Sequence, residues 1–64
     1  MIKKANIGDK ICVVMFPSTD INGNEYEVYG GGGIVLEVKE NSVIVDLFDG
    51  VVIEAEGTEF ELLN

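Results

Sequence analysis

Residues 30–53 read GGGGIVLEVKENSVIVDLFDGVVI, and this stretch decides the fold. Apolar and polar residues alternate over 34–38 and again over 43–48, which is the period of a β-strand. Lys39-Glu40-Asn41-Ser42 and Asp49-Gly50 separate the apolar runs and are typical of tight hairpin turns. The stretch therefore predicts three consecutive antiparallel strands, the last of which follows Gly50.

Two further strands are expected outside this meander, whose third strand covers 51–55. Residues 11–16 form an apolar run, rich in β-branched residues, that ends at Pro17 and favours strand over helix. Residues 60–62 predict a short final strand, and no segment has the 3.6-residue period of a helix. We expect one all-β domain over 1–64, a small five-stranded barrel built from a strongly bent antiparallel sheet, with residues 1–6 frayed.

The longest polar connection follows Pro17 and contains Asn22-Gly23, which predicts a type I′ turn at the tip of an arm-like hairpin. The segment from Asp20 to Glu25 also resembles the start of a calcium loop. Glu25 stands where such a loop needs glycine, and Gly31 stands where it needs a bidentate glutamate, so a plain turn is expected.

Four consecutive glycines, Gly30 to Gly33, have two interpretations. They can form a sharp bend or bulge at a corner of the barrel. They can also let a ligand approach the backbone closely, in a ligand loop made of Tyr26, Tyr29, Gly31 and Gly32. Neither a lysine nor a helix start follows, so the phosphate-loop pattern fails and the structural interpretation is favoured.

The charge distribution limits the classes of partner. The chain has twelve acids, four lysines, no arginine and no histidine, for a net charge of −8. The lysines are Lys3, Lys4, Lys10 and Lys39, and all of them precede the last 25 residues. The charged residues among those last 25 are all acidic. Nucleic-acid binding depends on a basic footprint, so direct binding to DNA or RNA is disfavoured, as is an anionic membrane. A partner protein with a basic surface fits better.

Catalytic and metal chemistry find no support in the residue types. One cysteine and no histidine exclude Ser/His/Asp and Cys/His nucleophile systems and a zinc site, so no catalytic residue, metal or cofactor is expected. Cys12 is expected to be a small buried hydrophobe in a reducing, cytoplasmic setting. There is neither an apolar signal-like region nor a run of about 20 apolar residues that would span a bilayer.

The pattern resembles an SH3-like small barrel of the KOW or Tudor type. The resemblance lies in Ile7-Gly8-Asp9-Lys10-Ile11, in the glycine-led strand Gly33 to Val38, in the hairpin to Val43 to Phe48, in Asp49-Gly50, and in Phe60 to Leu63. It implies the five-stranded bent sheet and allows peptide, RNA or methyl-lysine binding. The basic residues of RNA-binding members are missing, and an aromatic cage would have to come from Tyr26, Tyr29 and Phe48.

Strand alternation divides the apolar residues into two faces. One set is expected to fill the barrel: Ile11, Val13, Met15, Leu36, Val38, Val43, Val45, Leu47, Ile53, Phe60 and Leu62. The other set is expected to face outward as an interaction patch, unless a bulge reverses the parity or the arm covers it. It comprises Cys12 and six interface residues, Val14, Phe16, Val35, Ile44, Phe48 and Val52. An acidic rim of Glu37, Asp46, Asp49, Glu54 and Glu56 is expected around them.

These observations predict a non-enzymatic protein-interaction module that binds through an apolar strand face with an acidic rim. Self-association into a dimer is expected because a chain this short has a marginal core. A viral inhibitor of a host nucleic-acid or defence enzyme is a specific form of this function. A nucleic-acid-binding barrel and a small-ligand binder at Gly30–Gly33 are the alternatives.

Overall fold

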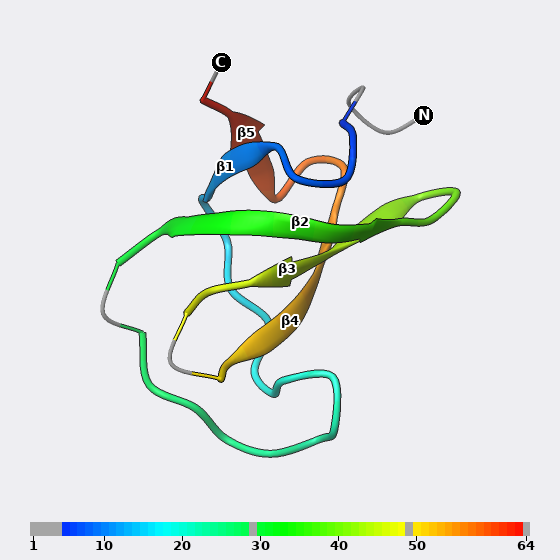
Figure 1. Ribbon diagram of the computed structural model, residues 1–64. Coiled ribbons are helices and arrows are strands. Elements are labelled where there is room, and N and C mark those ends of the chain that lie inside the picture. Colours follow the sequence, from blue (N-terminus) through cyan, green and yellow to red (C-terminus); the bar gives the residue numbers. More distant parts are fainter. Residues whose placement is uncertain (1–4, 29, 49, 64) are drawn as a thin grey trace.

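Five β-strands make up the regular structure of the chain, for which a computed structural model describes residues 5–28, 30–48 and 50–63 (Figure 1). The strands are β1 (Lys10–Val13), β2 (Gly32–Val38), β3 (Ser42–Asp46), β4 (Val52–Glu56) and β5 (Phe60–Leu62). The described residues contain no helix. The all-β class and the expected five strands are confirmed, with most strand ends within two residues of those expected.

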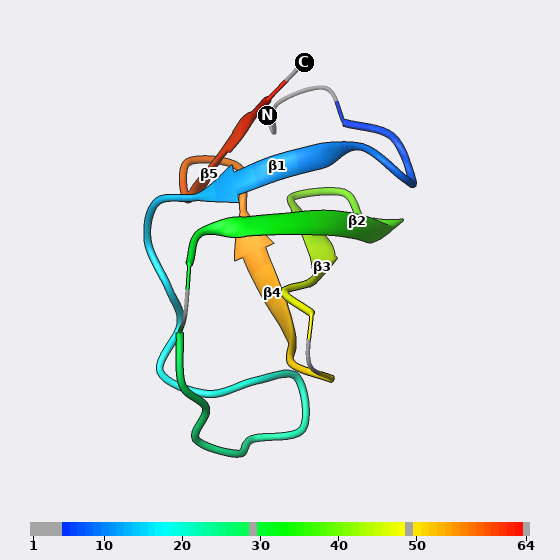
Figure 2. The same ribbon diagram turned by 60° about the vertical axis from the view of Figure 1, so that its left-hand side comes forward.

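The strands form one antiparallel sheet in the order β4-β3-β2-β1-β5. The sheet is strongly bent, so that β4 crosses steeply beneath β2 while β1 and β5 lie above it (Figures 1 and 2). The hydrogen-bonded ladder leaves β4 and β5 as edges, so the sheet is bent but not closed. The bent five-stranded sheet is confirmed.

The core lies inside the bend and draws on every strand. Its buried side chains are Ala5, Ile11, Val13, Val35, Val43, Val45, Ile53, Ala55 and Phe60. Because Ala5 is buried and the Asn6 N–H donates to Asp9 Oδ2 at 2.9 Å, the expected fraying does not reach residues 5 and 6. Residues 1–4 lie outside the described part of the chain.

A β-bulge in β2 reverses the expected parity of that strand. Val35 pairs with Val45 and Glu37 pairs with Ile44, so Leu36 is the extra residue between them. Val35 is fully buried, whereas Leu36 is 45% exposed. The prediction that Leu36 fills the core and that Val35 faces outward is therefore wrong, and the alternative of a bulge is the correct one. Val38 pairs with the buried Val43 on the expected face, but it is 39% exposed and does not fill the core either.

Strand β1 ends three residues earlier than expected, at Val13. The N–H groups of Val14 and Met15 both turn to the carbonyl of Glu59, at 2.8 and 3.2 Å. The change of direction leaves Met15 62% exposed, so its expected place in the core is wrong. Leu47 and Leu62 pack against the core but are only half-buried.

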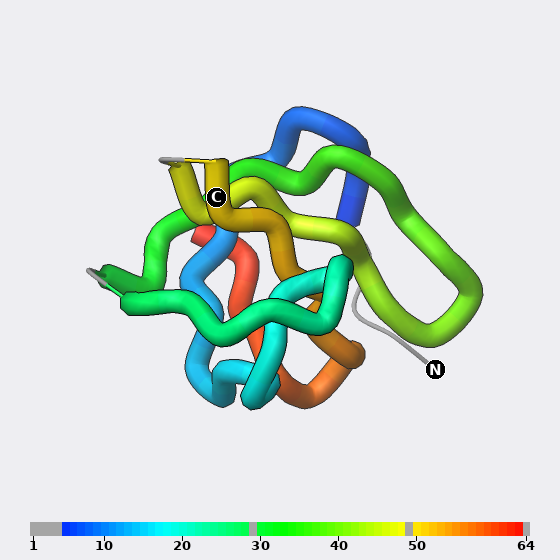
Figure 3. Tube along the Cα trace, turned by 90° about the horizontal axis from the view of Figure 1, so that it is seen from below, coloured from blue at the N-terminus to red at the C-terminus, as the bar shows by residue number. Residues whose placement is uncertain are grey.

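The long connection between β1 and β2, described over residues 14–28 and 30–31, forms an arm that runs across the lower end of the molecule (Figures 1 and 3). Phe16 and Tyr26 anchor this arm against the core. No strand is present in the described residues 14–28, so the expected paired hairpin does not form.

The tip of the arm is a three-residue turn rather than a type I′ turn. The Gly23 N–H donates to the Asp20 carbonyl and the Asp20 N–H to the Asn24 carbonyl, at 3.1 and 2.9 Å. Gly23 has φ +84° while Asn22 does not adopt positive φ, which matches a type I turn followed by a left-handed residue. The Asp20 carboxylate accepts the Asn22 and Asn24 N–H groups, at 2.8 and 3.0 Å, as an Asx cap.

The four glycines divide into two pairs. A Cβ at Gly33 would lie 2.5 Å from Val45 Cγ1, and one at Gly31 would lie 3.0 Å from Cys12 Sγ. Close packing at the bend thus requires these two glycines, as the structural interpretation expected. A Cβ at Gly30 or Gly32 would meet nothing within 4 Å, so packing does not explain that pair.

Candidate functional site

The face of β2, β3 and β4 that points away from the core combines aliphatic side chains with carboxylates. The register places Glu37, Ile44 and Glu54 in one row across the three strands, and Ile34, Asp46 and Val52 in the next row. Leu36, from the bulge, lies beside Glu37. We call this surface the outer face and define it by these residues: Ile34, Leu36, Glu37, Ile44, Asp46, Val52 and Glu54.

Among the apolar residues of the outer face, exposure is concentrated at Leu36. Ile44, at the centre, is only 9% exposed, and Ile34 and Val52 are half-buried. Leu36 is 45% exposed because the bulge carries its side chain out of the regular ladder. The face therefore offers one projecting aliphatic side chain on a flatter apolar base.

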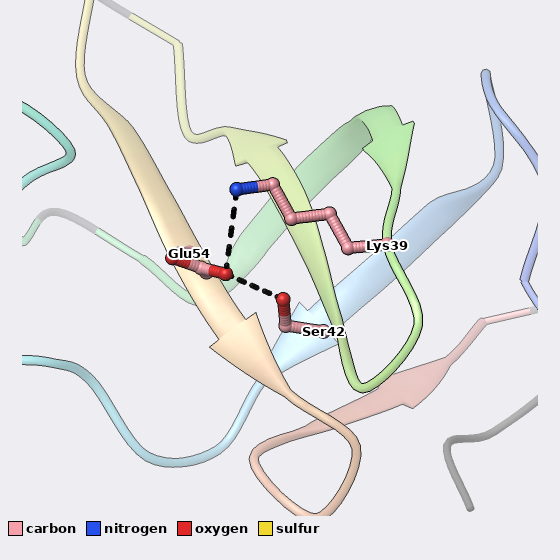
Figure 4. Close-up of polar contacts among 3 residues, drawn as sticks. All are labelled: Lys39, Ser42 and Glu54. Atoms are coloured by element: carbon pink, nitrogen blue, oxygen red, sulfur yellow. Dashed lines mark hydrogen bonds and ion pairs between the residues drawn. The ribbon is translucent and has the colours of Figure 1, made fainter.

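The carboxylates of the outer face differ in how strongly they are engaged. Glu54 Oε2 accepts the Ser42 hydroxyl at 2.5 Å and lies 3.7 Å from Lys39 Nζ (Figure 4). Both charged side chains are about half exposed, so this ion pair contributes little to stability. Asp46 Oδ1 accepts the Phe48 N–H at 2.8 Å. Glu37 is exposed, and the structure describes no ion pair for it.

A groove separates the arm from the free edge of β4. It has a volume of about 340 Å³ and is lined by Pro17, Thr19, Asp20, Ile21, Glu54, Glu56 and Glu59. The Ile21 N–H donates to the Val52 carbonyl at 3.0 Å and closes one end of the groove. We call it the edge groove. It joins the outer face at Glu54, so the two surfaces form one acidic region.

A second hollow, the glycine cleft, lies between the arm and the turn that joins β3 to β4. Its volume is about 280 Å³, and its lining comprises Glu27, Val28, Gly30, Gly32, Leu47, Phe48 and Val51. Phe48 is 53% exposed and adopts φ +75°, which is strained for an aromatic residue. Residue Asp49 of this turn lies outside the described residues.

The structure divides the predicted interface residues among several places. Ile44 and Val52 do lie on the outer face, but Val35 is in the core and cannot contribute to a surface. Phe16 packs against the core from the arm, Val14 is exposed beyond the end of β1, and Phe48 lines the glycine cleft. The single contiguous patch expected from alternation is therefore wrong.

The predicted acidic rim and ligand loop are only partly assembled. Glu37, Asp46 and Glu54 border the outer face, Glu56 lines the edge groove, and Asp49 lies outside the described residues. In the predicted ligand loop, Gly32 lines the glycine cleft but Gly31 packs against Cys12 and Val13, and Tyr29 lies outside the described residues.

Tyr26 has a structural contact in place of an open ligand position. Its hydroxyl donates to the Pro17 carbonyl at 2.5 Å and ties the two sides of the arm together. Burial, with the neighbouring negative charge of Asp20 as a smaller cause, raises the pKa of the Tyr26 hydroxyl above its usual value of 10.0. The phenol therefore stays protonated and able to donate throughout the neutral range.

Two residues of the outer face, Ile34 and Leu36, were missed by the sequence reasoning. Both were hidden by the bulge, since regular alternation assigns Leu36 to the core. Among the described residues, no three Cys, Asp or Glu side chains come together where they could hold a metal ion. The same residues include no helix long and apolar enough to cross a membrane.

Comparison with known proteins gives no relative: no family model, no curated protein and no solved structure matches the chain.

Proposed function

We propose that this protein is a non-enzymatic interaction module that binds a basic, partly apolar segment of a protein partner through its outer face. The observation that carries the proposal is Leu36, which a β-bulge lifts to 45% exposure beside Ile34, Ile44 and Val52. Bulges often re-aim a side chain at functional surfaces. An aliphatic anchor on an apolar base, framed by carboxylates, suits a partner that offers apolar and cationic groups together.

The charge of the whole chain supports this choice of partner. With a net charge of −8, the protein attracts basic surfaces and repels nucleic acid and anionic lipid. The two described lysines do not form a basic patch: Lys10 begins β1, and Lys39 lies beside Glu54 at 3.7 Å. The nucleic-acid-binding alternative is therefore the weaker one.

The finer form of the proposal is an SH3-like barrel that acts in the cytoplasm. The order β4-β3-β2-β1-β5, with a long first connection and a short last turn, supports the resemblance at the level of the fold. A specific version is a viral inhibitor whose acidic face occupies the basic nucleic-acid site of a host enzyme. Its support is the small size and strongly acidic charge of the chain.

Affinity capture with matched variants tests the proposal. Leu36→Glu places a charge on the outer face, whereas Met15→Glu makes the same kind of change at an exposed residue beyond β1. We expect the wild type and Met15→Glu to retain one basic partner, and Leu36→Glu to lose it by at least about tenfold in affinity. A partner retained equally by all three proteins, measured after circular dichroism confirms folding, contradicts the proposal.

The glycine cleft supports a second candidate function, the binding of a small apolar ligand. The specific observation is that Phe48 is held at φ +75° with an exposed side chain. Gly30 and Gly32 line the same cleft, and a Cβ at either position would meet nothing within 4 Å. Gly32→Val would fill the cleft. It should abolish the binding of any such ligand while leaving capture by the outer face unchanged.

A further inference from the structure

The free edge of β4 presents its main-chain groups at alternate residues. The Leu47 N–H donates to the Val51 carbonyl at 2.8 Å, so these two residues form a hydrogen-bonded pair. Such pairs alternate along an antiparallel ladder, so Val51, Ile53 and Ala55 are the residues that bond to β3. The N–H and C=O groups of Val52, Glu54 and Glu56 consequently point away from the sheet, toward the edge groove.

Both ends of this edge are closed by the chain itself. The Val52 carbonyl accepts the Ile21 N–H at 3.0 Å. The Glu56 N–H donates to Glu59 Oε1 at 2.9 Å, and the Glu56 carbonyl accepts the Glu59 N–H at 2.9 Å. Glu54 lies between these closures, and no hydrogen bond from any described residue reaches its main chain on this side. Glu54 thus offers one donor and one acceptor in the middle of this edge, and no described residue accepts the Val52 N–H beside it.

The walls of the edge groove determine what can occupy that position. Acidic residues from three segments line it, namely Asp20 of the arm, Glu54 and Glu56 of β4, and Glu59 of the following turn, while Pro17 and Ile21 are apolar. The Glu54 carboxylate also contacts Ser42 and Lys39. A second copy of this chain is a poor occupant, because antiparallel pairing of two β4 edges about Glu54 would place like charges opposite each other. Charge complementarity selects a cationic segment in extended conformation.

We propose that the protein partner adds an extended basic segment to the edge of β4, exchanging main-chain hydrogen bonds with Glu54 and placing Lys or Arg side chains among the carboxylates of the edge groove. This is strand addition limited to one bridge, since Ile21 and Glu59 block further pairing. The inference rests on the proposed function in one respect, namely that the partner is basic. The inference goes further by locating the binding site for the basic side chains of the partner in the edge groove, and by including hydrogen bonds to the main chain of the partner.

The test uses a synthetic peptide that alternates Lys and Thr, and a peptide of the same sequence in which every main-chain amide is N-methylated. Both are titrated into the ¹⁵N-labelled full chain. The parent peptide should shift the Glu54 amide to saturation. The N-methylated peptide should bind at least about tenfold more weakly, because it cannot donate to the Glu54 carbonyl.

Two charge-reversal variants separate the groove from the general acidity of the chain. Glu56→Lys should weaken binding of the parent peptide by at least about tenfold, whereas Glu61→Lys, an equal change on β5, should weaken it by less than about threefold at physiological salt. Equal binding of the two peptides, an unshifted Glu54 amide at saturation, or no binding of the parent peptide overturns the inference.

The outcomes also separate this inference from the proposed function. If the two peptides bind equally while Leu36→Glu still abolishes capture of the partner, the edge site fails and the outer face stands. If the peptides behave as expected while Leu36→Glu has no effect on capture, the edge site stands and the outer face fails.

Discussion

At the scale of single residues, two adjacent glycines differ in whether packing requires them. Gly33 and Gly32 are neighbours in β2, yet only Gly33 faces the fully buried Val45. A side chain at Gly33 would also approach the Asp46 carbonyl at 3.0 Å, and a backbone atom in a ladder cannot yield cheaply. Sequence alone could not tell these two glycines apart.

We expect Gly33→Ala to lower the free energy of unfolding by about 1–3 kcal/mol, because the new Cβ overpacks the bend. Gly32→Ala is the matched control, and it should leave stability unchanged or raise it by about 0.4–1 kcal/mol through the lower entropy of the unfolded chain. Urea unfolding followed by circular dichroism measures both. Equal stabilities for the two variants would show that the bend tolerates a side chain at Gly33.

At the scale of elements, the bulge in β2 decides which residues reach the outer face. Removing Leu36 would bring Glu37 directly after Val35 and give a regular ladder, in which Glu37 still pairs with Ile44 and Val38 with Val43. Every other side chain of the strand would keep its face. The bulge can therefore be deleted without reversing the parity of the core.

Deletion of Leu36 is expected to preserve the fold, with a change in stability of less than about 2 kcal/mol, and to abolish partner binding because the projecting side chain is lost. Nuclear Overhauser effects between Glu37 and Ile44 should confirm the register. Deletion of Glu37 is the matched control: it also removes the bulge, but it leaves Leu36 on the outer face opposite Ile44, so it should weaken binding less than deletion of Leu36 does. If both deletions bind the partner normally, Leu36 is not the anchor.

The bulge also explains where prediction from sequence stopped. The strands and the hairpin turns around β3 followed from alternation and turn residues, and they are present. One inserted residue reverses the alternation on one side of it, so the faces of Val35 and Leu36 were exchanged although the faces of Val43, Ile44 and Val45 in β3 were assigned correctly. The edge groove could not be predicted for a different reason. Its lining residue Asp20 is far in sequence from Glu56 and Glu59, and these residues come together only because the arm passes beside β4.

At the scale of the whole molecule, the edges of the sheet are protected against pairing with another copy. The arm and the turn after β4 close that edge on both sides of Glu54, and β5 is only three residues long. Short or covered edges are how native sheets avoid edge-to-edge association. Any dimer should therefore form through the outer face rather than by extending the sheet.

A dimer formed in this way would bring Glu37, Asp46 and Glu54 of two copies close together, within a pair of chains that each carry a net charge of −8. Because salt screens this repulsion while apolar contacts persist, we expect the dimer fraction to rise between about 0.05 M and about 0.5 M salt. Size-exclusion chromatography with light scattering measures this fraction. Leu36→Glu should keep the protein monomeric at both salt concentrations, whereas Met15→Glu should behave like the wild type. A dimer that dissociates as salt rises would show that ionic rather than apolar contacts hold it together. A dimer that survives Leu36→Glu would show that the contact lies outside the outer face.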